Sequence, residues 1–223
     1  MTESLINING DSIQTLEIIM LTTLISLMPS LVVMMTSFTR YIISLSFLRT
    51  ALGTQQTPPN LVLVGMALFL TLITMRPVLT QIQTQAYEPY VNEQISQEEF
   101  LDRAAVPLKE FMVRNTTMDT LGMFAELSEE ELPQPLNTTT ASTLPLTVIV
   151  PAFITHELKR AFEIGFLLYI PFMLLDVVVS TTLMSMGMIM LPPAMISMPF
   201  KLLLFITVDG WELLFSALIR GVF

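Results

Sequence analysis

Two long runs without a charged residue constrain the fold of this sequence more than any other feature. Between Glu17 and Arg40 lie 22 uncharged residues, and between Arg49 and Arg76 lie 26. As a helix, either run is long enough to cross the roughly 30 Å hydrocarbon layer of a membrane. The chain as a whole is 52% hydrophobic and only 13% charged, which is typical of a membrane protein and not of a soluble domain. The sequence therefore predicts a helical, membrane-associated fold.

The two apolar runs are joined by a basic connection. Its residues Arg40 and Arg49 are accompanied by no acid. Under the positive-inside rule, this connection is expected to face the cytoplasm, and both flanking regions to face outside. The second helix is expected to start near residues 57–60, because Pro58 and Pro59 suit the entrance of a helix and not its interior.

An acidic insert is predicted at about residues 77–145. Residues 81–140 contain eleven acidic and three basic side chains, which account for most of the formal net charge of −9. A chain with this balance is unsuited to binding nucleic acid. Apolar residues recur at helical spacing from Phe100 to Met112, and a second helix is expected from Met118 to Glu126. We expect a small helical domain on the outer side of the membrane.

The carboxyl-terminal part is apolar but carries isolated charges. Two further long segments are expected at about residues 162–186 and 199–219. A charge that faces lipid near the membrane centre costs about 2.5–3.5 kcal/mol even on the mildest scale, so this hairpin is expected to face protein or water within an oligomer. The charges that interrupt it are Glu163, Asp176, Lys201, Asp209 and Glu212.

These segments together predict an all-α fold of four long hydrophobic helices in two hairpins, with a helical exterior insert. The expected regions are an amino-terminal region of helices one and two (1–76), the acidic insert with its linker (77–145), and a carboxyl-terminal hairpin (146–223).

Lys201 needs a partner, because it is the single charged residue between Val177 and Val208. In one straight hairpin, Glu157 would differ from Lys201 by roughly 30 Å in depth, so this pair would require a neighbouring subunit or a bent helix. Asp176 and Asp209 are nearer carboxylates, and snorkelling of Lys201 to the membrane surface is the remaining alternative.

Catalytic and metal-binding motifs are absent from the sequence. His156 to Arg160 (HELKR) begins like the zinc motif H-E-x-x-H, but Arg160 replaces the second histidine, and the chain has one histidine and no cysteine. Neither a P-loop nor G-x-S-x-G occurs. We expect no enzymatic activity, no metal and no cofactor. A secondary transporter or proton-coupled channel that uses Asp176, Lys201 and Asp209 stays an alternative, although the two halves show no convincing repeat.

Methionine occupies every second position from Met184 to Met190, and Pro192 and Pro193 follow. A period of two scatters side chains around a helix instead of along one face, and prolines end a helix. We therefore expect part of this run to be a loop. Its unbranched, polarizable side chains could close around a variable object as an adaptable seal; the alternative is ordinary helix packing.

Three long stretches resemble the FliP family of flagellar export-gate proteins. They are MMTSFTRYIISLSFLRTALGTQQTPPNLVLVGMALFLT (Met34 to Thr71), PAFITHELKRAFEIGFLLYIPFMLLDVV (Pro151 to Val178) and MGMIMLPPAMISMPFKLLLFITVDGWELL (Met186 to Leu214). The resemblance covers nearly the whole chain. SFTR and LRTALGTQQTPPN look more flagellar than like the related virulence-secretion proteins.

The resemblance implies a pore-forming subunit of a type III protein export gate in the flagellar basal body, within the bacterial inner membrane. In this family a pentamer assembles with FliQ and FliR around a channel for unfolded flagellar export substrates, beside FlhA and FlhB. Hairpins that look transmembrane by hydropathy are there largely packed against other subunits.

The resemblance also implies two functional sets of residues. Met188, Ile189 and Met190, with Met186 before them, match the methionine-rich gate loop, and Ile189 stands where the family often has methionine. Glu157 and Lys201 match a charge pair between subunits. Many family members carry a cleaved signal peptide, whereas the first residues here do not look like one.

Overall fold

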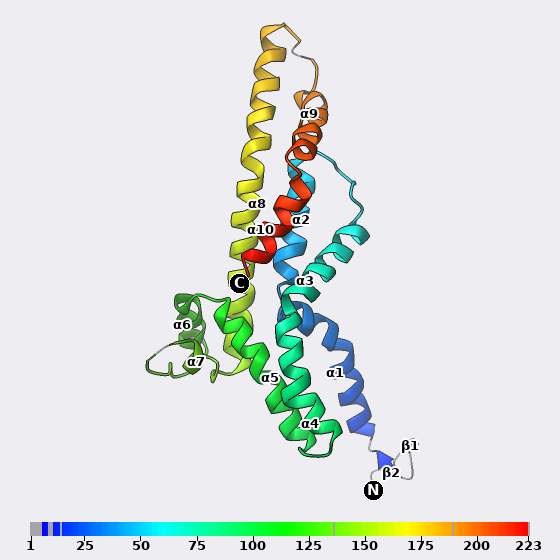
Figure 1. The fold of residues 1–223 in the computed structure, drawn as a ribbon, viewed down its shortest axis with the longest axis vertical. Coiled ribbons are helices and arrows are strands. Elements are labelled where there is room, and N and C mark those ends of the chain that lie inside the picture. Colours follow the sequence, from blue (N-terminus) through cyan, green and yellow to red (C-terminus); the bar gives the residue numbers. More distant parts are fainter. Residues whose placement is uncertain (1–5, 9–10, 14, 136, 189, 223) are drawn as a thin grey trace.

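The chain is predominantly helical, as predicted (Figure 1). The computed structural model describes residues 6–8, 11–13, 15–135, 137–188 and 190–222. Two short antiparallel strands, which are not among the predicted elements, precede the first helix. The elements in chain order are β1 (Ile6–Ile8), β2 (Asp11–Ile13), α1 (Thr15–Met34), α2 (Phe38–Ala51), α3 (Asn60–Ile82), the π-helix η1 (Gln83–Tyr87), α4 (Glu88–Val91), α5 (Gln97–Arg114), α6 (Met118–Leu127), α7 (Thr138–Ala141), α8 (Leu146–Ser185), α9 (Pro193–Thr207) and α10 (Gly210–Arg220).

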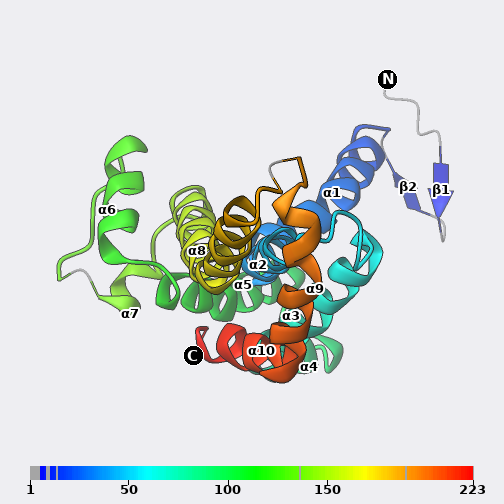
Figure 2. The same cartoon turned by 90° about the horizontal axis from the view of Figure 1, so that it is seen from above.

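The molecule is elongated, and α8 runs along much of its length (Figure 1). The helices of the insert, α4 to α7, gather at one end together with α1. The turn between α8 and α9 forms the opposite end. Helix α2 lies along α8 in the middle of the molecule, and α10 returns the carboxyl terminus to the side of α8. In the view from above, α6 and α7 lie on one side of the molecule and the two strands on the other (Figure 2).

The first predicted segment is divided into two helices, which corrects the expectation of one continuous span. Helix α1 ends at Met34, and α2 begins at Phe38. In the break, the buried hydroxyl of Ser37 lies 2.7 Å from that of Thr74 on α3. The predicted connecting loop at residues 40–49 is therefore wrong, because these residues form the body of α2.

The true connection between α2 and α3 lies at residues 52–59. Helix α2 ends before Gly53, whose positive φ of 77° suits the left-handed position after a helix. Pro59 is the N-cap of α3 and Asn60 its first residue. The predicted helix entrance at the two prolines is thus confirmed.

Helix α3 continues into the insert instead of ending near Arg76. Together with η1 and α4 it forms a helical stretch from Asn60 to Val91, with a mean hydropathy of 2.0 in its most apolar part. The expected boundary after residue 76 falls inside α3, whereas the boundary at 145/146 falls at the first residue of α8.

The two helices predicted in the insert are confirmed as α5 and α6. Helix α5 starts at an N-cap, Ser96, whose hydroxyl accepts a hydrogen bond of 3.2 Å from the amide of Glu99. Its inner face, with Phe111, Met112 and Val113, packs against α3 and α8. The location of this domain outside the membrane stays a prediction.

The carboxyl-terminal hairpin differs from the predicted pair of straight helices. Helix α8 is one helix of 40 residues, and the second arm is broken into α9 and α10, which meet at an angle of 66°. The break contains Asp209, which has a positive φ of 51°. Within the described residues, two helical stretches are long and apolar enough to span a membrane, or three if α9 and α10 form one span.

Candidate functional site

The loop between α8 and α9 begins at a well-defined helix end. Gly187 takes a φ of 77°, its amide donates to the carbonyl of Met184 at 3.0 Å, and the amide of Met188 donates to that of Leu183 at 3.0 Å. This is the Schellman arrangement, in which glycine supplies the left-handed residue that stops a helix. Pro192 then caps α9. The predicted loop is confirmed, and both of its ends are fixed by local sequence.

The methionines of this loop are exposed at the tip of the hairpin. The exposed fraction is 62% for Met186, 43% for Met188 and 98% for Met190. Ile189, the residue that departs from the family pattern, lies outside the described residues. Figure 1 places the loop at the far end of the molecule from the insert. Flexible apolar side chains are thus exposed at the tip of the hairpin in this chain.

A buried ion pair joins α2 to α8 in the middle of the molecule. Both guanidinium edge nitrogens Nε and Nη2 of Arg40 donate to the carboxylate of Glu157, with a distance of 2.8 Å from Nε to Oε2. The third nitrogen, Nη1, donates to the backbone carbonyl of Gly221 at 2.7 Å. Arg40 is 2% and Glu157 1% exposed. One arginine therefore fastens α2, α8 and the end of α10 together.

The sequence did not predict the structural role of Arg40. Its burial also weakens the prediction, based on the positive-inside rule, that residues 40–49 face the cytoplasm. The positive-inside rule counts charges in loops, but the charge of Arg40 is neutralised inside the fold. Arg49 alone remains at the end of α2, where its Nη1 donates to the side chain of Asn60.

A second cluster holds Lys201 between α8 and α9. Its Nζ lies 2.7 Å from Oδ2 of Asp176, and the hydroxyl of the fully buried Ser197 donates to Oδ1 of the same carboxylate at 2.6 Å. Of the alternatives left open by the sequence, the structure selects Asp176 within the chain. Ser197 was not predicted, although it lies one helical turn before Lys201.

Asp209 does not join this cluster. It is exposed in this chain at the break between α9 and α10, and its predicted burial within an oligomer stays a prediction. Among the described residues it forms no ion pair. An ion path through Asp176, Lys201 and Asp209 therefore lacks its third member.

The Asp176–Lys201 pair is asymmetric, because the side chain of Lys201 is 8% exposed and that of Asp176 41%. Asp176→Asn should leave a buried ammonium without a counter-charge and lower the free energy of unfolding by about 1–2 kcal/mol. Lys201→Met should cost less than about 1 kcal/mol, because water can reach the carboxylate that remains. Guanidinium unfolding of the chain in detergent micelles measures both, and a larger loss for Lys201→Met would contradict the assignment.

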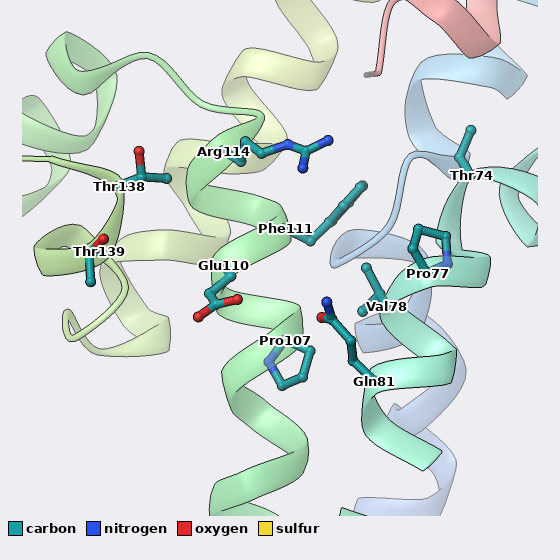
Figure 3. Close-up of a pocket in the computed structure, with 10 residues that line it drawn as sticks. All are labelled: Thr74, Pro77, Val78, Gln81, Pro107, Glu110, Phe111, Arg114, Thr138 and Thr139. Carbon is teal, nitrogen blue, oxygen red and sulfur yellow. The ribbon is translucent and has the colours of Figure 1, made fainter. Parts of the chain in front are cut away.

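A cavity of about 330 Å³ lies where α5 of the insert meets α3, with α7 on its other side (Figure 3). Figure 3 shows the ring of Phe111 between the two long helices, Gln81 reaching toward α5, and Glu110 on the side of α5 that faces Thr139. None of the predicted site residues lines this cavity.

Two side chains of HELKR form ion pairs within the chain. Glu157 pairs with Arg40, and Arg160 pairs with Glu163 through a distance of 3.1 Å between Nη1 and Oε2. Glu157, the one acid of the motif, and Glu163, which follows it on the same helix, are thus paired with different arginines.

The fold and the site define a class: a predominantly helical, membrane-associated protein with a methionine-rich loop at the tip of a long helical hairpin. The model of the FliP family matches residues 21–218. The chain therefore belongs to the FliP family.

Relatives from several bacteria are similar along nearly the whole chain. The flagellar biosynthetic protein FliP of Caulobacter vibrioides is 47% identical over 226 residues, which cover 99% of this chain and 83% of that protein. The protein of the same name from Aquifex aeolicus is 44% identical over 215 residues (95% and 87%). That from Bacillus subtilis is 46% identical over 207 residues (93% and 91%). The chain is thus a flagellar biosynthesis component of the export apparatus, and these names indicate no catalytic activity.

Proposed function

We propose that this chain is a pore-forming subunit of the flagellar type III export gate. Copies of it, a pentamer by resemblance to the family, surround a channel for unfolded flagellar export substrates in the bacterial inner membrane. FliQ and FliR complete the complex, and FlhA and FlhB lie beside it. The loops between α8 and α9 meet at the channel axis and close it at rest.

The loop at the hairpin tip carries this proposal. Its methionines are exposed, they lie at the extremity of the longest helix, and Gly187 and Pro192 keep them out of the flanking helices. Thioether side chains can repack around many shapes at little cost, which a seal needs when it must close after each substrate.

The surface of α8 beyond its midpoint supports assembly with neighbouring subunits. Large apolar side chains there are exposed, for example Met173 at 53%, Leu174 at 63% and Val178 at 60%. Such a surface needs lipid or another protein to cover it. A ring of copies, with other membrane subunits around it, would cover the part of this helix that leads to the gate loop.

A charge pair between Glu157 and Lys201 of adjacent subunits stays a prediction. Within one chain, both oxygens of Glu157 already accept from Arg40, and Lys201 is held by Asp176. An intersubunit contact would require Lys201 to leave Asp176, or Glu157 to be shared between two cations. Assembly would then replace an ion pair within each chain by one between chains, because neither charge is free beforehand.

The gate is tested by shortening its side chains. In the assembled complex, replacing Met188, Ile189 and Met190 together with alanine should open a leak to ions and small molecules, because the ring of loops loses most of its filling volume. We expect the conductance of the resting complex in planar bilayers to rise at least about tenfold, as an unplugged pore carries ions that an apolar constriction excludes.

Met195→Ala is the matched control, since Met195 is 71% exposed but lies in α9 outside the loop. It should leave the resting conductance unchanged. If the triple variant assembles fully and stays as tight as the unaltered complex, the seal is elsewhere and the proposal fails.

A further inference from the structure

The face of α8 that carries HELKR is basic and lies beside a pocket. His156, Lys159, Arg160 and Glu163 follow one another at the spacing of a single helix face and all line the same pocket. This part of the motif has no role in the loop or in the Arg40–Glu157 pair.

The opposite wall comes from the junction between α5 and α6. Arg114, at the end of α5, and residues 115–117 line it, and the backbone near Gly221 closes one side. The pocket has a volume of about 470 Å³ and is open to the surface. Four separate parts of the chain therefore meet around one small polar space.

The charge balance of this pocket is positive, although the chain as a whole has a formal net charge of −9. The charge of Arg40 at its base is offset by Glu157, and Glu163, the sole acid in its wall among the described residues, already pairs with Arg160. Lys159 and Arg114 form no ion pair in the described part of the chain. Two positive charges thus remain without a counter-charge.

Unused hydrogen-bonding groups belong to the residues around this pocket. Nδ1 of His156 is buried and has no partner within the described residues. Helix α6, of ten residues, starts beside the pocket at its N-cap Thr117, whose hydroxyl bonds that of Thr120 and caps no amide. The positive end of a helix is thereby left for an anion.

The pocket borders apolar surface on α8. Phe162 is 58% exposed and Phe166 68%, and they follow the basic turn directly along the helix. A cationic pocket that passes into exposed apolar surface matches the two ends of a phospholipid. A free inorganic phosphate would occupy the cationic pocket alone and would not contact the apolar surface.

We propose that the pocket between α5, α6 and α8 binds a phosphate group, and that this group is the head of an anionic phospholipid. Lys159 and Arg114, the two cations without a counter-charge, hold the phosphate from two walls. Arg160, which keeps its pair with Glu163, adds a positive charge beside Lys159. The acyl chains lie along Phe162 and Phe166. The site is distinct from the gate loop, which lies at the far end of α8, so neither assignment depends on the other.

Lipid binding to the purified full chain in detergent micelles tests the site. Phosphatidylglycerol, phosphatidylcholine and inorganic phosphate are titrated separately, and bound lipid is counted by native mass spectrometry. Phosphatidylglycerol should bind more tightly than phosphatidylcholine. Lys159→Gln with Arg160→Gln should weaken phosphatidylglycerol binding roughly tenfold or more, as expected for the loss of two cations at a phosphate. Arg114→Gln should weaken it from the other wall.

Arg103→Gln is the control, because it removes an equal charge from α5 at an exposed pair with Glu99. It should leave phosphatidylglycerol binding unchanged. Equal affinity in the control, the double variant and Arg114→Gln would overturn the site. If phosphatidylglycerol binds more tightly than inorganic phosphate and the two compete for the same site, the lipid assignment is supported. If phosphate binds but phosphatidylglycerol is not preferred over phosphatidylcholine, the lipid assignment is overturned.

Discussion

Replacing Arg40 with methionine is expected to lower the free energy of unfolding by about 3–5 kcal/mol. The change leaves the carboxylate of Glu157, which is 1% exposed, without its counter-charge and without two hydrogen bonds. It also removes the donor to the carbonyl of Gly221. Guanidinium unfolding in detergent micelles, followed by the helical circular dichroism signal, measures the loss.

Two further variants separate the ion pair from the loss of a side chain. Arg40→Met combined with Glu157→Met should recover much of the stability, because a buried ion pair can be replaced by apolar groups of similar volume at little cost. Arg49→Met removes an arginine at the other end of the same helix, where it is only partly buried, and should cost less than about 1 kcal/mol. Equal losses for Arg40→Met and Arg49→Met would contradict the role assigned to the pair.

Helix boundaries with a local chemical cause were predictable from the sequence. Pro58 and Pro59 fix the start of α3, and Pro192 fixes the end of the methionine loop. The alternation of methionine with other residues showed that the loop begins before the prolines. Each of these signals acts within a few residues, so no knowledge of the tertiary structure was needed.

The break between α1 and α2 had no comparable signal. Thr36 and Ser37 are ordinary polar residues inside an apolar run, and the break is stabilised by a hydroxyl contact with Thr74 on another helix. The sequence therefore predicted one long helix and placed Arg40 in a loop. The partner that buries Arg40 lies 117 residues further along the chain, beyond the reach of periodicity or local charge counting.

The charge clusters were predictable in part. Spacing along a hairpin placed Asp176 among the nearer partners of Lys201 but could not decide between it and Asp209. The choice depends on the break in the second arm, which exposes Asp209 and turns Lys201 toward α8 with Ser197 beside it. The expectation that copies assemble around a channel came from the family resemblance, because the sequence of one chain does not reveal the symmetry of an oligomer.

A larger side chain at Gly165 is expected to force α2 and α8 apart. A Cβ atom built there would lie 2.4 Å from Cδ2 and 2.5 Å from Cγ of Phe47, far inside contact distance. The ring of Phe47 cannot swing aside freely, since it packs edge-on against Phe162 and Tyr169, with centroid distances of 5.3 and 6.2 Å. Gly165→Leu should therefore lower the free energy of unfolding by about 3 kcal/mol through overpacking.

Gly65→Leu is the matched control in α3, where an added Cβ meets nothing within 4 Å. Leucine is a better helix former than glycine by up to about 1 kcal/mol, so this change should leave stability equal or slightly higher. The same gain in helix propensity acts at Gly165, and the difference between the two variants thus isolates the steric term at the contact of α2 with α8. If both variants unfold at the same guanidinium concentration in detergent micelles, α2 does not approach α8 as closely at Gly165 as the structure places it.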